Sequence, residues 1–148
     1  MKIRLLLPLV GLAISFALPT SDQEQTAVDP ETRQQIEAVR TQFVEAYNKH
    51  DAAAVAALYT QDAVRLLSWE SESGLASGQQ AIGKKFAVEF ASSPSNESHK
   101  LLQVYALGSE ICAMTEWNIP PFSNKKAGVR IYVRDADTWK VRVDYVTE

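Results

Sequence analysis

Polar side chains recur at every second position in strand-like runs near the end of the chain, and several of them could bind a ligand or transfer a proton. Glu116 lies in EICAMTEWNI, Arg130 and Tyr132 lie in AGVRIYVRD, and Arg142 and Asp144 lie in TWKVRVDYV. Alternate residues of a strand share a face, so these side chains could gather into one polar patch across neighbouring strands. Glu116 or Asp144 could then act as a general acid or base.

A structural explanation of the same rows competes with this functional one. Aliphatic residues such as Val129, Ile131 and Val133 alternate with the polar ones. Aliphatic rows commonly form the core, while charged rows face water or a partner subunit. Opposite charges on adjacent strands are also ordinary cross-strand pairs. We favour this structural interpretation, and the sequence leaves open which face of the sheet is concave.

The two histidines do not form a recognisable metal site in the sequence. His50 follows the end of a predicted helix and His99 begins a strand directly after a loop, so we expect both side chains to be exposed. Neither has a histidine partner at the spacing of metal ligands on a helix or a strand. The sequence also lacks a GxSxG motif, a phosphate-binding loop and a dinucleotide-binding glycine pattern. We therefore predict no required metal and no nucleotide cofactor.

The chain length and the N-terminal segment indicate one exported domain. A chain of 148 residues can form a single domain with a core of its own. Lys2 and Arg4 precede an apolar run, residues 5–18, that is too short to span a bilayer. Ser15 and Ala17 provide the small side chains that signal peptidase accepts. We therefore predict a cleaved secretory signal and a periplasmic or secreted protein with no stable membrane anchor.

The predicted organisation is a signal peptide over residues 1–20, a flexible leader over 21–28 and a single domain over 29–148. Without the two basic residues of the signal, the chain keeps 13 basic and 18 acidic side chains, a net charge of −5. A mildly acidic domain without a basic stripe has no electrostatic reason to bind nucleic acid or anionic lipid. The lone cysteine, Cys112, lies in an apolar run and is predicted to be a buried, inert thiol.

The first half of the predicted domain is mostly helical. Asp29 caps a helix that begins at Pro30 and carries one apolar stripe over about five turns. Asp51 caps a second, short and alanine-rich helix that folds back close to the first. Strand character follows over residues 62–70, and a capping box at Ser77 opens a third helix.

Four β-rich runs make up the remainder of the chain: HKLLQVYAL, EICAMTEWNI, AGVRIYVRD and TWKVRVDYV. Their separators are short, so neighbouring runs should pair antiparallel. Helices first and strands last predict the α+β class, with three N-terminal helices packed on one face of a curved antiparallel β-sheet.

Four motifs carry a family resemblance: FVEAYNKHD at residues 43–51, VAALYTQDAV at 55–64, GQQAI at 78–82 and WKVRV at 139–143. With them the chain resembles the NTF2-like superfamily, and within it the SnoaL-like or DUF4440 type, over residues 30–148. The resemblance implies a cone whose open end admits a ligand between sheet and helices. The superfamily hosts isomerases, cyclases, dehydratases and pure binding domains, so the motifs indicate the fold more than the activity.

The resemblance also implies where an enzyme of the ketosteroid-isomerase type would carry its catalytic groups. The general-base aspartate would fall at Leu66 or Leu67, and the helix tyrosine would fall near Phe43. The second acid would fall near Ala127. Leucine cannot carry a proton and phenylalanine has no hydroxyl to donate. These departures argue against ketosteroid-isomerase chemistry.

Two functions of different classes remain open, and we favour a third less than either of them. We favour an exported domain that binds a small, largely apolar molecule in its cone without turning it over. Its predicted ligand-binding residues are Phe43, Tyr47, Leu67, Trp69, Trp117 and Tyr132.

The second function is a SnoaL-like isomerase, cyclase or dehydratase with a non-standard acid–base set such as Tyr47, Glu116 and Asp144. The third is a dimeric protein-interaction module. By resemblance, we expect a homodimer formed through the open face of the sheet.

Export should remove about twenty residues from the N-terminus, because the predicted signal ends in small residues that signal peptidase recognises. N-terminal sequencing of the exported protein measures this directly. An exported protein that still begins at Met1 would contradict the signal prediction.

Overall fold

The structure is a computed structural model that describes residues 26–68, 74–92, 96–120 and 125–147, and it confirms the α+β class. Its elements follow in the order β1 Thr26–Ala27, α1 Pro30–Asn48, α2 Ala52–Ala57, β2 Tyr59–Leu67, β3 Leu75–Ser77, α3 Gln79–Ser92, β4 Ser98–Leu107, β5 Glu110–Asn118, β6 Lys126–Asp135 and β7 Thr138–Thr147. Within these ranges, every helix is too short or too polar to cross a bilayer.

Side-chain caps start the first two helices, as the sequence predicts. Asp29 Oδ1 accepts a hydrogen bond from the Thr32 amide at 2.9 Å, and Asp51 Oδ1 accepts one from the Ala54 amide at 2.9 Å. Between these helices His50 has a φ of +54°, a left-handed conformation that reverses the chain. The reversal places α2 against both α1 and α3.

The strands form one mixed sheet in the order β1-β4-β5-β6-β7-β2-β3. The hairpin neighbours β4–β5, β5–β6 and β6–β7 are antiparallel, as expected, but β2 and β7 are parallel. The prediction of an antiparallel sheet is therefore wrong at this pair. It relied on short connections, whereas most of the domain separates β2 from β7 and no turn sets their relative direction. Within the predicted leader, Thr26 and Ala27 pair with β4 as strand β1.

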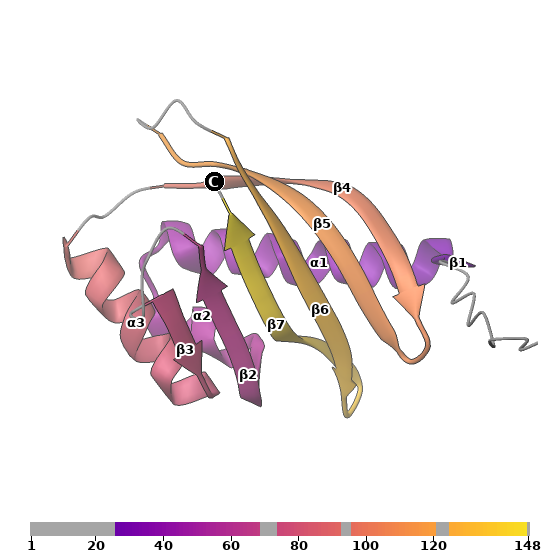
Figure 1. Ribbon diagram of the computed structural model, residues 1–148, viewed down its shortest axis with the longest axis horizontal. Helices are drawn as coiled ribbons and strands as arrows, with labels where there is room; N and C mark the ends of the chain where they lie inside the picture. Colours follow the sequence, from indigo (N-terminus) through magenta and orange to yellow (C-terminus); the bar gives the residue numbers. More distant parts are fainter. Residues whose placement is uncertain (1–25, 69–73, 93–95, 121–124, 148) are drawn as a thin grey trace, which may run out of the picture.

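The helices cover one face of the curved sheet, as Figure 1 shows, with α1 running across the strands and α3 beside β2 and β3. The main core lies between these layers and joins Phe43 and Phe86 of the helices to Tyr59, Tyr132 and Val141 of the sheet. A second, smaller cluster consists of Leu67, Trp117 and Val146. We call the helix-covered side of the sheet its inner face.

A bulge in β7 changes which side chains reach the inner face. Tyr132 pairs with Val141 and the next residue back along β6, Ile131, pairs with Val143, so β7 carries one extra residue between them. Val141 is buried before the bulge, and Asp144 is buried after it. Trp139, Val141, Val143 and Tyr145, which strict alternation would put on one face, are therefore divided between the two faces.

On β6 the polar row lies on the inner face. Arg130 and Tyr132 are fully buried, whereas Val129 and Ile131 are half-buried on the other side. The interpretation that aliphatic rows form the core while charged rows face water is therefore wrong for β6. Burial of the polar row is tolerated because Asp144 faces Arg130 from β7 and pairs with its charge.

The outer face of the sheet is apolar across four strands. One row of paired positions crosses β2, β7, β6 and β5 through Leu66, Tyr145, Val129 and Met114. A second row crosses the same strands through Val64, Val143, Ile131 and Cys112. Leu66, Met114 and Tyr145 are 38%, 39% and 36% exposed. Burial raises the pKa of the half-buried Cys112 thiol, which keeps it protonated.

Replacing Phe86 with alanine should lower the free energy of unfolding by roughly 3–5 kcal/mol, because a fully buried aromatic side chain is removed from the centre of the main core. Val88→Ala on the same helix is the matched control, since Val88 is 67% exposed and should change stability by less than about 0.5 kcal/mol. Urea unfolding of both variants tests this. Equal losses of stability in the two variants would mean that the face of α3 that carries Phe86 does not pack against the core.

Candidate functional site

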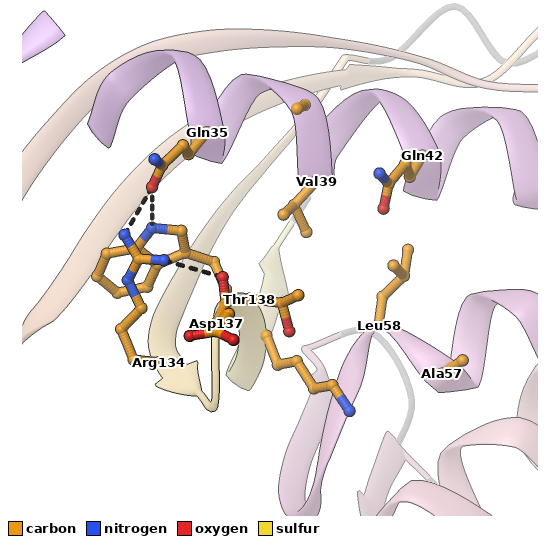
Figure 2. A pocket seen from close by; sticks show the side chains of 11 residues that line it. Gln35, Val39, Gln42, Ala57, Leu58, Arg134, Asp137 and Thr138 are labelled. Carbon is orange, nitrogen blue, oxygen red and sulfur yellow. Dashed lines mark hydrogen bonds between the residues drawn. The ribbon is translucent and has the colours of Figure 1, made fainter. Parts of the chain in front are cut away.

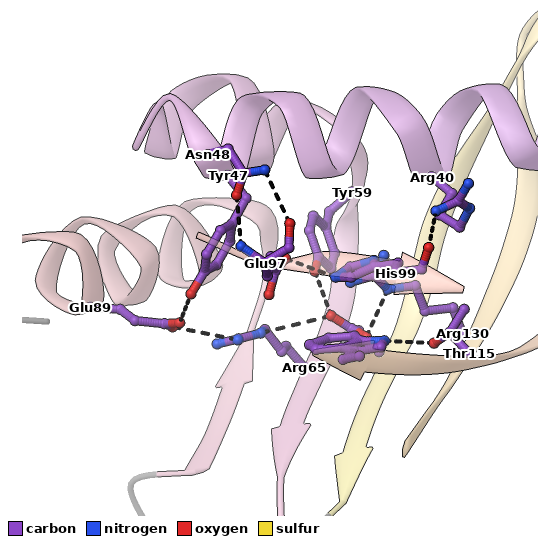
Figure 3. Close-up of polar contacts among 12 residues, drawn as sticks. Arg40, Tyr47, Asn48, Tyr59, Arg65, Glu89, Glu97, His99, Thr115 and Arg130 are labelled. Atoms are coloured by element: carbon purple, nitrogen blue, oxygen red, sulfur yellow. Dashed lines mark hydrogen bonds and ion pairs between the residues drawn. The ribbon is translucent and has the colours of Figure 1, made fainter. Parts of the chain in front are cut away.

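A buried ionic cluster lies on the inner face, where β2, β6 and β7 are neighbours. Arg130 Nε donates to Asp144 Oδ1 at 2.9 Å, and the Tyr59 hydroxyl donates to Asp144 Oδ2 at 2.5 Å. Arg65 Nε lies 3.7 Å from the same Oδ2 atom. Arg65 approaches this carboxylate from β2 and Arg130 approaches it from β6. Figure 3 shows both arginines, with Tyr59, among these polar contacts. One carboxylate is thus shared by two guanidinium groups and a phenol.

The electrostatics of the cluster hold Asp144 in its charged form. Burial alone would raise the pKa of Asp144, but the charges of Arg130 and Arg65 and the hydrogen bonds it accepts outweigh burial and keep that pKa below its usual value. Burial, with the nearby negative charge of Asp144, raises the pKa of Tyr59 well above its usual value. Tyr59 is therefore a neutral donor beside a fixed carboxylate.

Aromatic rings lie against both buried guanidinium groups. Arg130 Cζ lies 3.9 Å from the ring centre of Phe43 and 4.8 Å from that of Trp117. Arg65 Cζ lies 4.2 Å from the ring centre of Phe86. Such cation–π contacts stabilise a desolvated cation and restrict the directions from which another group can approach it.

A buried acid and a buried imidazole extend the cluster from β4 and the segment before it. His99 Nε2 lies 2.8 Å from Glu97 Oε1, and the imidazole ring stacks on Trp117 with ring centres 4.6 Å apart. α1 holds this segment in place. The Asn48 side chain bonds to the backbone of Glu97 at 2.8 and 3.0 Å, and Arg40 Nη1 donates to the His99 carbonyl at 2.6 Å.

The expectation that His99 is exposed is wrong, because its side chain has no exposed surface. A position directly after a loop suggested exposure, but α1 covers this end of β4 through the bonds from Asn48 and Arg40. Burial, together with the charge of Arg130, lowers the pKa of His99 well below its usual value. Burial raises the pKa of Glu97 to about 8. Both groups are therefore neutral near pH 7, with the Glu97 hydroxyl donating to Nε2 of His99.

Several buried polar atoms around these groups have no hydrogen-bond partner among the described residues. They include Nη1 and Nη2 of Arg130, Nη1 of Arg65, Nδ1 of His99 and the hydroxyl of Tyr132. A buried donor without an acceptor typically costs about 1–3 kcal/mol. Their concentration around one carboxylate is unusual for a core with a purely structural role. We call Tyr59, Arg65, Glu97, His99, Arg130, Tyr132 and Asp144 the inner polar site.

The structure brings some of the predicted site residues together at this place. Phe43 and Trp117 contact Arg130, while Tyr132 and Asp144 belong to the inner polar site itself. Tyr47 lies nearby, where its hydroxyl donates to Glu89 Oε1 at 2.8 Å.

Other predicted site residues lie elsewhere. The Glu116 side chain is on the outer side of β5, where it pairs with Lys125 at 2.9 Å, and Arg142 pairs with Glu110 at the surface. The predicted polar patch of β5, β6 and β7 therefore does not form as one group. Leu67 packs against Trp117 in the smaller cluster. Trp69 lies outside the described residues.

The leucines at the expected base position point to opposite faces. Leu67 is buried on the inner face and Leu66 is 38% exposed on the outer face. The inner position at this point of β2 therefore carries an aliphatic side chain. Two residues earlier on the same face is Arg65, which sequence reasoning missed. A charged residue spaced by two from buried apolar residues of one strand was the available signal.

A separate groove of about 430 Å³ lies between α1, the end of α2 and the β6–β7 turn. Figure 2 shows Gln35 at one end of it, where its side-chain oxygen accepts hydrogen bonds from Arg134 at 2.7 Å and from Trp139 at 2.9 Å. Paired polar groups of this kind stabilise the fold. In the part of the chain that the structure describes, no cluster of three or more His, Cys, Asp or Glu side chains could hold a metal ion.

The chain is similar in sequence to one protein family and in fold to several solved structures. A family model described as a SnoaL-like domain matches residues 41–148. An NTF2-like protein from Pseudomonas putida KT2440 is 14% identical with a TM-score of 0.67, over 82% of this chain and 89% of that one. A ketosteroid isomerase-like protein from Erwinia carotovora atroseptica SCRI1043 is 16% identical with a TM-score of 0.65, over 80% and 97%. At these identities the structural similarities show the NTF2-like fold alone. A sequence search of curated proteins gave no match.

Replacing Glu97 with glutamine should remove a loss of stability that the unaltered protein shows as pH rises from about 5 to about 8. The pKa of Glu97 is about 8 in the folded protein and has an ordinary value of 4.5, so the neutral carboxyl stabilises the fold fully below pH 4.5 and this stabilisation is lost as pH rises through about 8. The slope is at most about 1.4 kcal/mol per pH unit for one proton.

Urea unfolding at several pH values in this range measures the effect. Glu116→Gln is the matched control, because Glu116 forms a surface ion pair and its loss should leave the pH dependence unchanged. A Glu97→Gln protein with the same slope as the unaltered one would show that Glu97 is already ionised in the fold.

Proposed function

This chain belongs to the SnoaL-like domain family, and from that premise we propose that it binds a small molecule between its helices and the inner face of its sheet. The observation that carries the proposal is the set of buried N–H and O–H groups of the inner polar site that lack acceptors among the described residues. Pairing with a ligand would offset the cost of burying these groups.

The surroundings of the inner polar site suit a molecule that is largely apolar. Phe43, Phe86 and Trp117 present their rings to the two arginines, and Leu67 packs beside Trp117. Aromatic and aliphatic walls with a few directed polar groups are typical of small-molecule sites. The residues predicted to bind a ligand from sequence, Trp69 apart, lie in or next to this region, and their role remains a proposal.

Ligand binding fits the chain better than ketosteroid-isomerase chemistry does. The inner position of β2 where such an enzyme carries its base holds Leu67, and Phe43 stands where a tyrosine hydroxyl would be needed. Neither side chain can exchange a proton or donate to an oxyanion. Export to the periplasm or the medium remains part of the proposal, on the strength of the signal-like N-terminus.

A second candidate function is acid–base catalysis by Glu97 and His99, and their geometry favours it over the set Tyr47, Glu116 and Asp144. The two groups are 2.8 Å apart, buried and close to the charge of Arg130. Perturbed acids and imidazoles of this kind often serve proton transfer. A rate that depends on pH near 8 and disappears in Glu97→Gln would support an isomerase, cyclase or dehydratase.

The homodimer expected from the resemblance remains a prediction, as does the alternative of a protein-interaction module. The outer apolar face, formed by the two rows of paired positions across β2, β7, β6 and β5, is the surface that such a dimer would cover. Rows of half-exposed aliphatic side chains on a sheet are typical of interfaces.

Native mass spectrometry of protein purified from its own exported compartment tests the binding proposal. We expect a mass above that of the denatured chain, with the difference lost on denaturation, and the same spectrum reports dimer or monomer. A double variant, Arg130→Met with Asp144→Asn, should lose the added mass because it removes the central ion pair as a unit. Arg142→Gln at the surface is the control and should keep the added mass.

Binding would be contradicted by a bare protein that also shows no change in melting temperature with any compound of a metabolite library. A stable ligand binds the folded state and must raise its stability.

A further inference from the structure

We propose that the ligand of the inner polar site carries a single carboxylate, which binds the free edge of the Arg130 guanidinium group with help from Arg65. The inference rests on the proposed function and names the chemical class of the molecule bound. Three features support it: the net charge of the buried side chains, the atoms of Arg130 that have no acceptor, and the apolar side chains around the two arginines.

The buried charges leave one positive charge in excess. Arg65 and Arg130 are cations, and Asp144 is the carboxylate between them. Glu97 and His99 form a hydrogen-bonded pair in which both groups are neutral near pH 7. Glu89 pairs with Arg65 at 3.5 Å from the edge of the site, where its side chain is 30% exposed. A ligand with one negative charge would balance the fully buried charges of Arg65, Arg130 and Asp144, whereas a dianion would exceed that balance.

The directions left open around Arg130 select a planar group with two oxygen atoms. Asp144 occupies the Nε position, and the rings of Phe43 and Trp117 cover the guanidinium group from 3.9 and 4.8 Å. The terminal atoms Nη1 and Nη2 lack acceptors within the described residues. Two parallel N–H groups in one plane match the two oxygens of a carboxylate.

Neighbouring donors can complete the recognition of the same group. Arg65 Nη1, the Tyr132 hydroxyl and Nδ1 of His99 are likewise without acceptors in the described chain. Tyr132 lies two residues from Arg130 on the same face of β6. Burial raises the pKa of Tyr132 despite the opposing charge of Arg130, so its hydroxyl stays a neutral donor. We expect these N–H and O–H donors to supplement the edge of Arg130 when a carboxylate binds.

The remainder of the ligand should be apolar, since Phe43, Phe86, Trp117 and Leu67 border the arginines. The terminal nitrogens of Arg130 are buried in the structure, so a covering side chain must move before a carboxylate reaches them. We therefore expect the free protein to be closed and binding to be coupled to a local opening.

Matched acids and amides test the charge requirement. Titration calorimetry at pH 7 with phenylacetate, hexanoate and benzoate should give binding, and the corresponding neutral amides should bind at least tenfold more weakly. A salt bridge to a buried cation supports a difference of that size or more. The purified, processed chain is used, freed of any bound molecule by denaturation and refolding.

Variants assign the effect to the two arginines. Arg130→Met combined with Asp144→Asn, which avoids leaving a buried carboxylate unpaired, should lower acid affinity at least tenfold and by a larger factor than it lowers amide affinity. Arg65→Gln should lower acid affinity as well. Arg142→Gln at the surface should bind the acids as the unaltered protein does.

Equal affinity for acids and amides would overturn the proposal, as would undiminished acid binding by both arginine variants. So would the failure of every acid in the panel to bind at about 1 mM, a concentration that reveals weak complexes. A neutral molecule in the native mass spectrum together with any of these results would leave the proposed binding function standing. Acids that bind while the native spectrum shows a bare protein would support the carboxylate class and indicate a ligand lost during purification.

Discussion

The inner face of the sheet depends on the carboxylate of Asp144. It accepts hydrogen bonds from Arg130 and Tyr59, and it lies within ion-pair distance of Arg65. Without it, two guanidinium groups would face each other in a region with little water, an arrangement that costs several kcal/mol. The aromatic rings of Phe43 and Phe86 contribute cation–π contacts but carry no charge. Burial of so many polar groups is tolerated because this one anion serves three donors.

The bulge in β7 is what brings Asp144 to this position. Strict alternation from the buried Val141 would send Asp144 to the outer face, and the extra residue restores it to the inner one. Tyr145 is turned outward by the same step and joins the outer apolar face. A single inserted residue therefore decides both the polarity of the inside and the apolar character of the outside.

Local signals made much of the fold predictable. Asp29 and Asp51 identify the helix starts because capping is a local interaction between side chain and backbone. The hairpins of the C-terminal strands follow from short connections. The parallel pairing of β2 with β7 was not predictable, because it depends on contacts between distant segments. His99 was misplaced for the same reason, since α1 rather than its own strand buries it.

The candidate site was harder to predict than the fold, because the alternation of side chains between the inner and outer faces shifts by one residue at each bulge. Glu116 and Arg142 share with Arg130 the pattern of a polar residue between apolar ones, yet only Arg130 reaches the inner face. Arg65 and Glu97 looked like surface residues by type. Arg65 is buried beside Asp144 of β7, and the segment of Glu97 is held against α1 by Asn48. Charge burial is a property of the assembled sheet, which explains why composition and spacing did not indicate it.

The parallel contact of β2 with β7 has a consequence for the order in which the molecule can form. Tyr59 and Asp144 are 85 positions apart in the chain, so joining them closes a loop that contains most of the domain. Pairings of such high contact order form slowly and late. Until the last strand arrives, Arg65 has no buried carboxylate to meet and stays solvated. A chain without β7 therefore lacks the carboxylate at the centre of the inner polar site, and a nascent chain can complete the site only after β7 has been synthesised.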